Sequence, residues 1–236
     1  MHALKLDTML RNFLRFWSQE HSLTALLLVM IVDLFVLFPM TGGGRVVDLG
    51  ADLVFSLILL AGLRSMARRK TVRVFFSLFV VLSAVTHFAW KLFDLNFLAS
   101  WNSLFSTLAV MGMLIVTLWM VYQDGPVTVH RIRGAIAAYL LIGVLFAKAY
   151  TLINYLMPGA FNMALPVTTF REEGRQAFYY FSIVTLTTVG YGDITAVAPT
   201  ARSLVMAEAL IGQLFPAILL ARLVTLEIET RRSGKG

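Results

Sequence analysis

The chain has 236 residues, of which 58% are hydrophobic and 14% are charged, and its mean hydropathy is +0.79. A soluble core of this size cannot bury so much apolar surface, so the composition excludes a soluble domain and predicts a protein in lipid. The absence of cysteine excludes disulfides, thiolate chemistry and cysteine metal sites. The net charge of +7 is distributed as in a membrane protein, so we expect no nucleic-acid binding.

The first 22 residues carry apolar side chains at helical spacing, among them Leu6, Leu10, Phe13 and Trp17, with basic residues on the other faces. This pattern predicts an amphipathic helix that lies on the membrane surface. A frayed tail is the alternative interpretation.

Six apolar segments follow, each close to the roughly 20 residues that cross a bilayer. They cover residues 23–40, 47–63, 72–91, 101–122, 134–157 and 199–227. A basic cluster separates the second segment from the third, and we expect it to attract anionic lipid headgroups. The cluster consists of Arg64, Arg68, Arg69, Lys70 and Arg73.

The loops between these segments differ in basic charge. With six crossings, fourteen Lys and Arg residues lie on the side of the two termini and five lie on the opposite side. Because basic loops remain in the cytoplasm, both termini are predicted to be cytoplasmic. The loop before the last segment then enters the membrane from outside.

That loop contains the sequence Thr188-Val189-Gly190-Tyr191-Gly192. Glycine reaches φ > 0 without steric cost, so the alternating glycines allow successive carbonyls to face one side, where they can replace the water around a cation. A Gly-Tyr-Gly string alone can be a simple turn. Here, however, an aromatic-rich segment at 176–184 precedes it and a long apolar segment begins at Pro199.

With these residues and flanks, residues 134–230 resemble the pore module of tetrameric potassium channels, especially small prokaryotic ones. The resemblance implies an all-α membrane protein with six transmembrane helices, a re-entrant pore helix and a selectivity filter, assembled as a C4 homotetramer in the plasma membrane. It implies K⁺ ions in the filter and no catalysed reaction. A nonselective cation channel and a subunit of a potassium uptake transporter are the alternatives.

The apolar pattern, together with the resemblance, divides the chain into regions. Residues 1–22 form the surface helix, 23–122 a four-helix sensor-like domain, 123–133 a linker, 134–230 the pore domain and 231–236 a cytoplasmic tail. A conventional voltage sensor needs basic residues along the fourth segment, and 101–122 contains no Lys, Arg, Asp or Glu. We therefore expect no voltage gating, and a receptor-like role for the first four segments is the alternative.

Further site residues are implied by their positions in the family pattern. Tyr180 and Phe181 would brace Tyr191, with Thr187 and Asp193 supporting the two ends of the filter. Gly212 is at the family's hinge position, and Pro216 removes the amide that would bond its carbonyl, so this pair predicts a gating hinge, with packing as the alternative role for the glycine. The residues predicted to line the cavity are Gln213, Ala217, Leu220 and Val224.

Two charged residues lie inside the last two apolar segments. Lys148 is nine residues before Met157, and Glu208 is nine residues after Pro199. At about 1.5 Å per residue, both lie at the same depth on adjacent helices. This predicts an ion pair behind the filter, and pairing with backbone or with another subunit is the alternative.

Overall fold

The computed structural model describes residues 22–37, 70–93, 97–123, 128–163 and 173–233. Residues 1–21 of the predicted surface helix, the apolar segment at 47–63 and Arg64, Arg68 and Arg69 of the basic cluster lie outside these ranges. The elements are α2 (Ser22–Val32), the π-helical η1 (Asp33–Leu37), α5 (Lys70–Phe93), α6 (Phe97–Val121), α7 (Val129–Leu156), β1 (Phe161–Met163), α8 (Glu173–Leu186), β2 (Ile194–Ala196) and α9 (Pro199–Ser233).

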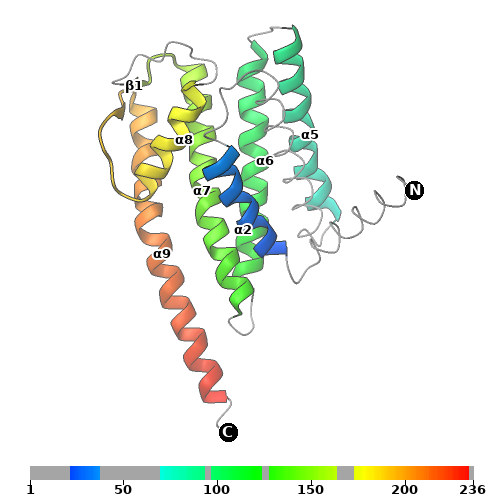
Figure 1. Ribbon diagram of the computed structural model, residues 1–236, viewed down its shortest axis with the longest axis vertical. Coiled ribbons are helices and arrows are strands. Elements are labelled where there is room, and N and C mark those ends of the chain that lie inside the picture. Colours follow the sequence, from blue (N-terminus) through cyan, green and yellow to red (C-terminus); the bar gives the residue numbers. More distant parts are fainter. Residues whose placement is uncertain (1–21, 38–69, 94–96, 124–127, 164–172, 234–236) are drawn as a thin grey trace, which may run out of the picture.

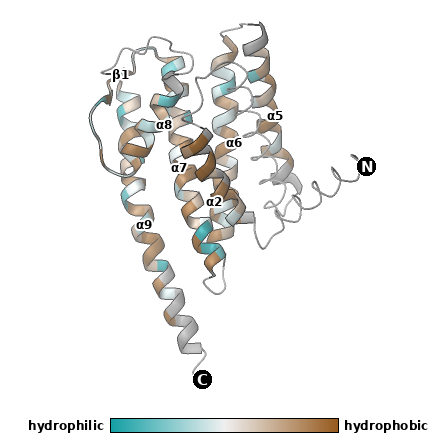
Figure 2. Ribbon diagram, viewed as in Figure 1, coloured by the Kyte–Doolittle hydropathy of each residue, from teal (hydrophilic) through white to brown (hydrophobic). Residues whose placement is uncertain are grey.

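Three helices of the described ranges are long and apolar enough to cross a membrane, at Phe97–Val121, Val129–Leu156 and Pro199–Arg222. Two shorter apolar helices, Leu23–Val36 and Val74–Ala89, also coincide with predicted segments. Figure 2 shows apolar residues along α2, α6, α7 and α9. The mainly helical fold and three of the spans therefore agree with the sequence, whereas six crossings stay a prediction.

The helices α5, α6 and α7 lie side by side in chain order, and α2 packs against α7 (Figure 1). Close approach depends on small residues, because a Cβ on Gly112 of α6 would come within 2.0 Å of the Phe76 ring on α5. A Cβ on Gly134 of α7 would come within 2.6 Å of Leu23 on α2. Glycine at these positions thus leaves room for side chains of the neighbouring helices.

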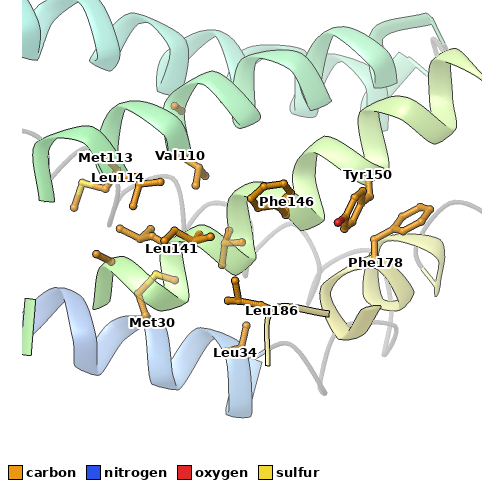
Figure 3. Close-up of a cluster of buried hydrophobic side chains, with 14 of the residues drawn as sticks. Met30, Leu34, Val110, Met113, Leu114, Leu141, Phe146, Tyr150, Phe178 and Leu186 are labelled. Atoms are coloured by element: carbon orange, nitrogen blue, oxygen red, sulfur yellow. The ribbon is translucent and has the colours of Figure 1, made fainter. Parts of the chain in front are cut away.

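The core between α2, α6 and α7 follows the helical period of the sequence. On α2 and η1 the large buried side chains are Leu23, Leu26, Met30 and Leu34, which recur every three or four residues, and the small Ala25 is buried beside them. Figure 3 shows Met30 facing Leu141 of α7 and Leu34 facing Leu186, with residues of α6 above them. The core continues along α7 to Tyr150, which lies beside α8 (Figure 3).

The helix α7 begins earlier than the apolar pattern predicted. Thr128 precedes the first turn, and its hydroxyl accepts a hydrogen bond from the Arg131 amide at 3.3 Å, which satisfies one of the free N–H groups at the helix start. The last five residues of the predicted linker, 129–133, are therefore helical. The polar Arg131 and Arg133 concealed this start from a hydropathy reading.

Candidate functional site

The short helix α8 lies between α7 and α9 (Figure 1) and ends at Leu186, two residues before Thr188. It includes the predicted pore-helix segment 176–184. A Cβ on Gly143 of α7 would meet the Ile183 side chain at 2.8 Å, so this glycine allows α8 to lie directly on α7. The negative end of the α8 dipole therefore lies immediately before the Thr-Val-Gly-Tyr-Gly sequence, where it favours a cation.

The backbone of this sequence adopts the unusual conformation that its glycines permit. Gly190 has φ of 56° and Gly192 has φ of 81°, as predicted from the need for positive φ. Thr188 also has φ of 60°, which costs about 1–2 kcal/mol for a residue with a Cβ and was not anticipated. Positive φ thus occurs at every second residue from 188 to 192, so the chain is neither helix nor strand here.

The amides of the same stretch turn back toward α8. Thr188 N donates to Thr185 O at 2.9 Å, and Val189 N donates to Val184 O at 2.9 Å. Gly190 N donates to the same Val184 oxygen at 3.3 Å. These bonds satisfy carbonyls that the end of a helix leaves free, so the N–H groups of residues 188–190 are held on the α8 side.

At the far end of the sequence, Tyr180 connects α8 to Tyr191 and Asp193. The rings of Tyr180 and Tyr191 stack with 6.5 Å between centroids and 5° between planes. A hydrogen bond to Asp193 raises the pKa of the Tyr180 hydroxyl, and Asp193 Oδ1 accepts the Ile194 amide at 3.1 Å. This contact agrees with the predicted brace, although the bracing role itself stays a prediction.

Phe181 and Thr187 lie elsewhere. Phe181 is buried away from Tyr191 in this chain, with its ring centroid 5.2 Å from that of Tyr150 on α7. The same aromatic cluster contains Phe161 and Phe178, whose ring centroids are 4.8 Å apart. The Thr187 hydroxyl donates to Ile183 O at 2.7 Å and so extends the end of α8. Within one chain, Phe181 therefore packs α8 onto α7 instead of touching the filter tyrosine.

A two-stranded antiparallel sheet, which the sequence reading did not anticipate, holds the segment after Asp193. Asn162 of β1 pairs with Thr195 of β2, and Val197 N donates to Ala160 O at 2.8 Å. The sheet ties the end of the filter segment to the loop that follows α7. Strands of three residues are too short to produce an alternating pattern that could be recognised in the sequence.

Gly212 lies against the end of α8. A Cβ at this position would be 2.0 Å from Leu186 O and 2.8 Å from Leu186 C, so only glycine fits there. The same Leu186 oxygen accepts a hydrogen bond from the Tyr139 hydroxyl of α7 at 3.1 Å. The helix α9 continues through Gly212 and the exposed Pro216 to Ser233. The packing role weighed for Gly212 is thus present in the structure, and the hinge stays a prediction.

The predicted cavity-lining residues lie after Gly212 on α9, and all are exposed in the single chain: Gln213, Ala217, Leu220 and Val224. Only 11% of the apolar window at Pro199–Arg222 is buried, against 56% for Phe97–Val121. Other faces of the helix are equally open, since Leu214 and Ile218 are 53% and 56% exposed. The burial therefore does not distinguish a cavity face from a lipid face, and the cavity assignment stays a prediction.

The structure gives Glu208 partners other than the predicted Lys148. Glu208 is fully buried and accepts a hydrogen bond from the Tyr150 hydroxyl, and Ser182 Oγ lies 2.5 Å from its Oε1. The Lys148 ammonium instead lies 5.6 Å from the centre of the Tyr179 ring. Residues two apart along a helix point about 200° away from each other, so Tyr150 faces Glu208 of α9 while Lys148 lies over Tyr179 of α8.

One further contact was not predicted. Arg222, near the C-terminal end of the apolar part of α9, donates from Nη2 to the backbone oxygen of Tyr122 at 2.8 Å. Its guanidinium carbon also lies 4.6 Å from the centre of the Tyr122 ring, within the range of a cation–π interaction. Tyr122 directly follows α6, so the contact joins α6 to α9. The sequence feature that could have indicated this contact is a single arginine near the end of an apolar segment.

Comparison with known proteins places the similarity in the same region. Residues 150–229 match a protein-family model described as "Ion channel". The inward rectifier potassium channel Kirbac3.1 of Paramagnetospirillum magnetotacticum is 34% identical over 97 residues, covering 39% of this chain and 27% of that protein. The two pore potassium channel c of Oryza sativa subsp. japonica is 39% identical over 88 residues, covering 37% of this chain and 17% of that protein.

The chain thus spans about a quarter or less of the length of these curated relatives. No solved structure matches it significantly. The matches nevertheless confirm the resemblance that was based on residues 134–230.

Proposed function

Because the C-terminal region of this chain is related to potassium channels, we propose that the protein is a potassium-selective ion channel that conducts K⁺ passively across the plasma membrane. The observation that carries the proposal is the positive φ at Thr188, Gly190 and Gly192 immediately after α8. The amides of 188–190 bond back to α8, so the carbonyls of this stretch are left to bind ions. Carbonyl oxygens of Thr188, Val189, Gly190, Tyr191 and Gly192 are the proposed K⁺ ligands.

The proposed assembly is a C4 homotetramer, because each chain contributes one filter strand and a closed ring of strands is needed around the ions. The exposure of the filter supports this assembly. Tyr191 is 72% exposed and Val189 is 52% exposed in the single chain, although both are large apolar or aromatic side chains. Neighbouring copies of the chain would cover these two side chains. In such an assembly the exposed faces of α9 would lie against other copies of the chain or against lipid.

The proposed channel lacks conventional voltage gating. The helix α6, at the position of the fourth segment, contains no charged residue along Phe97–Val121, so the membrane potential has no charge to move there. Gating instead is proposed to involve α9 beyond Gly212. Gly212 is held against α8, so bending at the Pro216 position would move the C-terminal half of α9 and leave the filter in place.

The experiment is a planar-bilayer recording of the purified protein under a KCl/NaCl bi-ionic gradient with voltage steps of both signs. A reversal potential close to the K⁺ equilibrium value, with currents that do not depend on time after a step, is the expected result. A reversal near zero would identify a nonselective cation channel. Steep voltage-dependent opening would contradict the inference from the uncharged α6.

A further inference from the structure

The feature that carries a further inference is the buried group around Glu208, one helical turn before Gly212 on α9. Its carboxyl group contacts a hydroxyl from each of two other helices, Tyr150 of α7 and Ser182 of α8. All three side chains are fully buried, with 0% exposure. Burying a carboxyl group costs free energy unless hydrogen bonds in the protein replace those it made with water. The hydrogen-bond partners of Glu208 therefore decide whether this site is stable.

The hydrogen atoms of this group can be counted. Three short contacts connect it: Tyr150 Oη to Glu208 Oε2, Ser182 Oγ to Glu208 Oε1 at 2.5 Å, and Ser182 Oγ to the Gly143 carbonyl at 2.6 Å. The two hydroxyls supply two hydrogens, and the Gly143 carbonyl supplies none. A third hydrogen is needed if every contact is a hydrogen bond, and only the Glu208 carboxyl can carry it.

The protonated form completes the group. Tyr150 donates to Oε2, the Glu208 hydroxyl donates from Oε1 to Ser182 Oγ, and Ser182 donates to Gly143 O. The ionised form would leave two acceptors to share the single Ser182 hydrogen. It would also place a net charge among partners that, within the described residues, are neutral hydroxyls, which is costly in a buried site.

The group is close to the filter along the chain. Ser182 belongs to the last turns of α8, which ends at Leu186 just before Thr188. Leu186 O is held by Tyr139 of α7 at 3.1 Å, and Gly212 of α9 packs against the same carbonyl. The C-terminal half of α8 is therefore attached to both neighbouring helices, by hydrogen bonds at Ser182 and by close packing at Leu186.

We propose that Glu208 is a positioning residue that acts as a neutral, hydrogen-bonding acid and fixes the pore helix α8 between α7 and α9. Glu208 does not contact the proposed ion path. It holds α8, and the amides of the proposed filter donate hydrogen bonds to the carbonyls at the end of α8. This role rests on the proposed channel function. Loss of the hydrogen bonds from Glu208 to Tyr150 and Ser182 allows α8 to shift, and this shift favours a nonconducting filter.

The test uses single-channel recordings of the full chain reconstituted in planar bilayers with symmetric KCl. Glu208→Gln can keep both bonds of the protonated carboxyl group, because its amide N donates to Ser182 and its oxygen accepts from Tyr150, while it adds one further amide hydrogen. We expect this variant to gate as wild type does. Glu208→Leu keeps a side chain of similar size and loses both bonds made by the carboxyl group, and we expect the ratio of long-closed to open time to rise about tenfold, as for a lost buried hydrogen bond.

Two further variants guard against misfolding of Glu208→Leu. Tyr150→Phe and Ser182→Ala each remove one hydroxyl and should raise the same ratio by a smaller factor. Ser106→Ala is the matched control, since Ser106 is also buried but donates to Ser103 O within α6, far from α8 in the sequence. Infrared spectra add a direct readout, in which a protonated-carboxyl C=O band of wild type should disappear in Glu208→Gln.

The outcomes separate this proposal from the channel proposal. If wild type shows no K⁺ selectivity, the channel function fails first. If wild type is selective and Tyr150→Phe, Ser182→Ala and every Glu208 variant that assembles gate as wild type does, the positioning role is overturned. If Glu208→Gln is as impaired as Glu208→Leu, or the infrared band is missing from wild type, the acid is not neutral and the proposal is equally overturned.

Discussion

Replacing Gly212 with alanine tests how tightly α9 is held to the pore helix. The new Cβ would be 2.0 Å from Leu186 O and 2.8 Å from Leu186 C. An ordinary van der Waals separation is about 3.5 Å, so the two helices would have to separate locally by more than about 1 Å. Both clashing atoms are backbone, and no side-chain rotation can relieve the contact.

The expected cost is about 1–3 kcal/mol per chain, as for overpacking of a close contact. Because Leu186 leads directly into Thr187 and Thr188, the shift should reach the filter. We expect Gly212→Ala to lower the thermal midpoint of unfolding by about 2 °C or more and to reduce K⁺ selectivity in the bi-ionic recording.

Gly134→Ala is the matched control, because it adds the same methyl group to a buried glycine of α7. There the nearest atom is a Leu23 methyl at 2.6 Å, which belongs to a side chain that can rotate. We expect a smaller loss of stability and unchanged selectivity. Altered opening in Gly212→Ala, with stability and selectivity unchanged, would show that Gly212 serves as the hinge and would refute the packing argument.

Three further variants test other contacts. Pro216→Ala restores a backbone N–H for the Gly212 carbonyl and should shift open probability in single-channel records, and unchanged gating would remove the reason for a hinge there. Tyr180→Phe keeps the ring on Tyr191 and loses the bond to Asp193, so we expect the filter to inactivate more readily, by a factor that matches about 0.5–1.5 kcal/mol, in long recordings. Arg222→Ala loses both contacts with Tyr122 and should change open probability. Arg231 is a basic residue later on the same helix, and Arg231→Ala should leave open probability unchanged. Equal effects of the two variants would indicate a general role of basic charge.

Much of the structure around residues 188–192 could be predicted from the sequence, because its determinants are local. Gly190 and Gly192 have positive φ as their residue type predicts, and the aromatic segment before them forms α8. The approximate extents of α6, α7 and α9 follow from long apolar runs. Thr188 escaped prediction because its positive φ is imposed by the bonds between the filter amides and α8 and not by its own side chain.

Other features depended on how the helices are rotated and placed, which no local pattern specifies. The depth of Lys148 and Glu208 could be counted along the chain, but the partner of Glu208 was decided by which face of α7 meets α9. The rotation of α7 brings Tyr150 to the carboxyl group, and the placement of α8 brings Ser182, across sequence separations of 58 and 26 residues. Gly212 likewise reads as a hinge in the sequence, and only the backbone of Leu186 packed against it reveals why a side chain is excluded there.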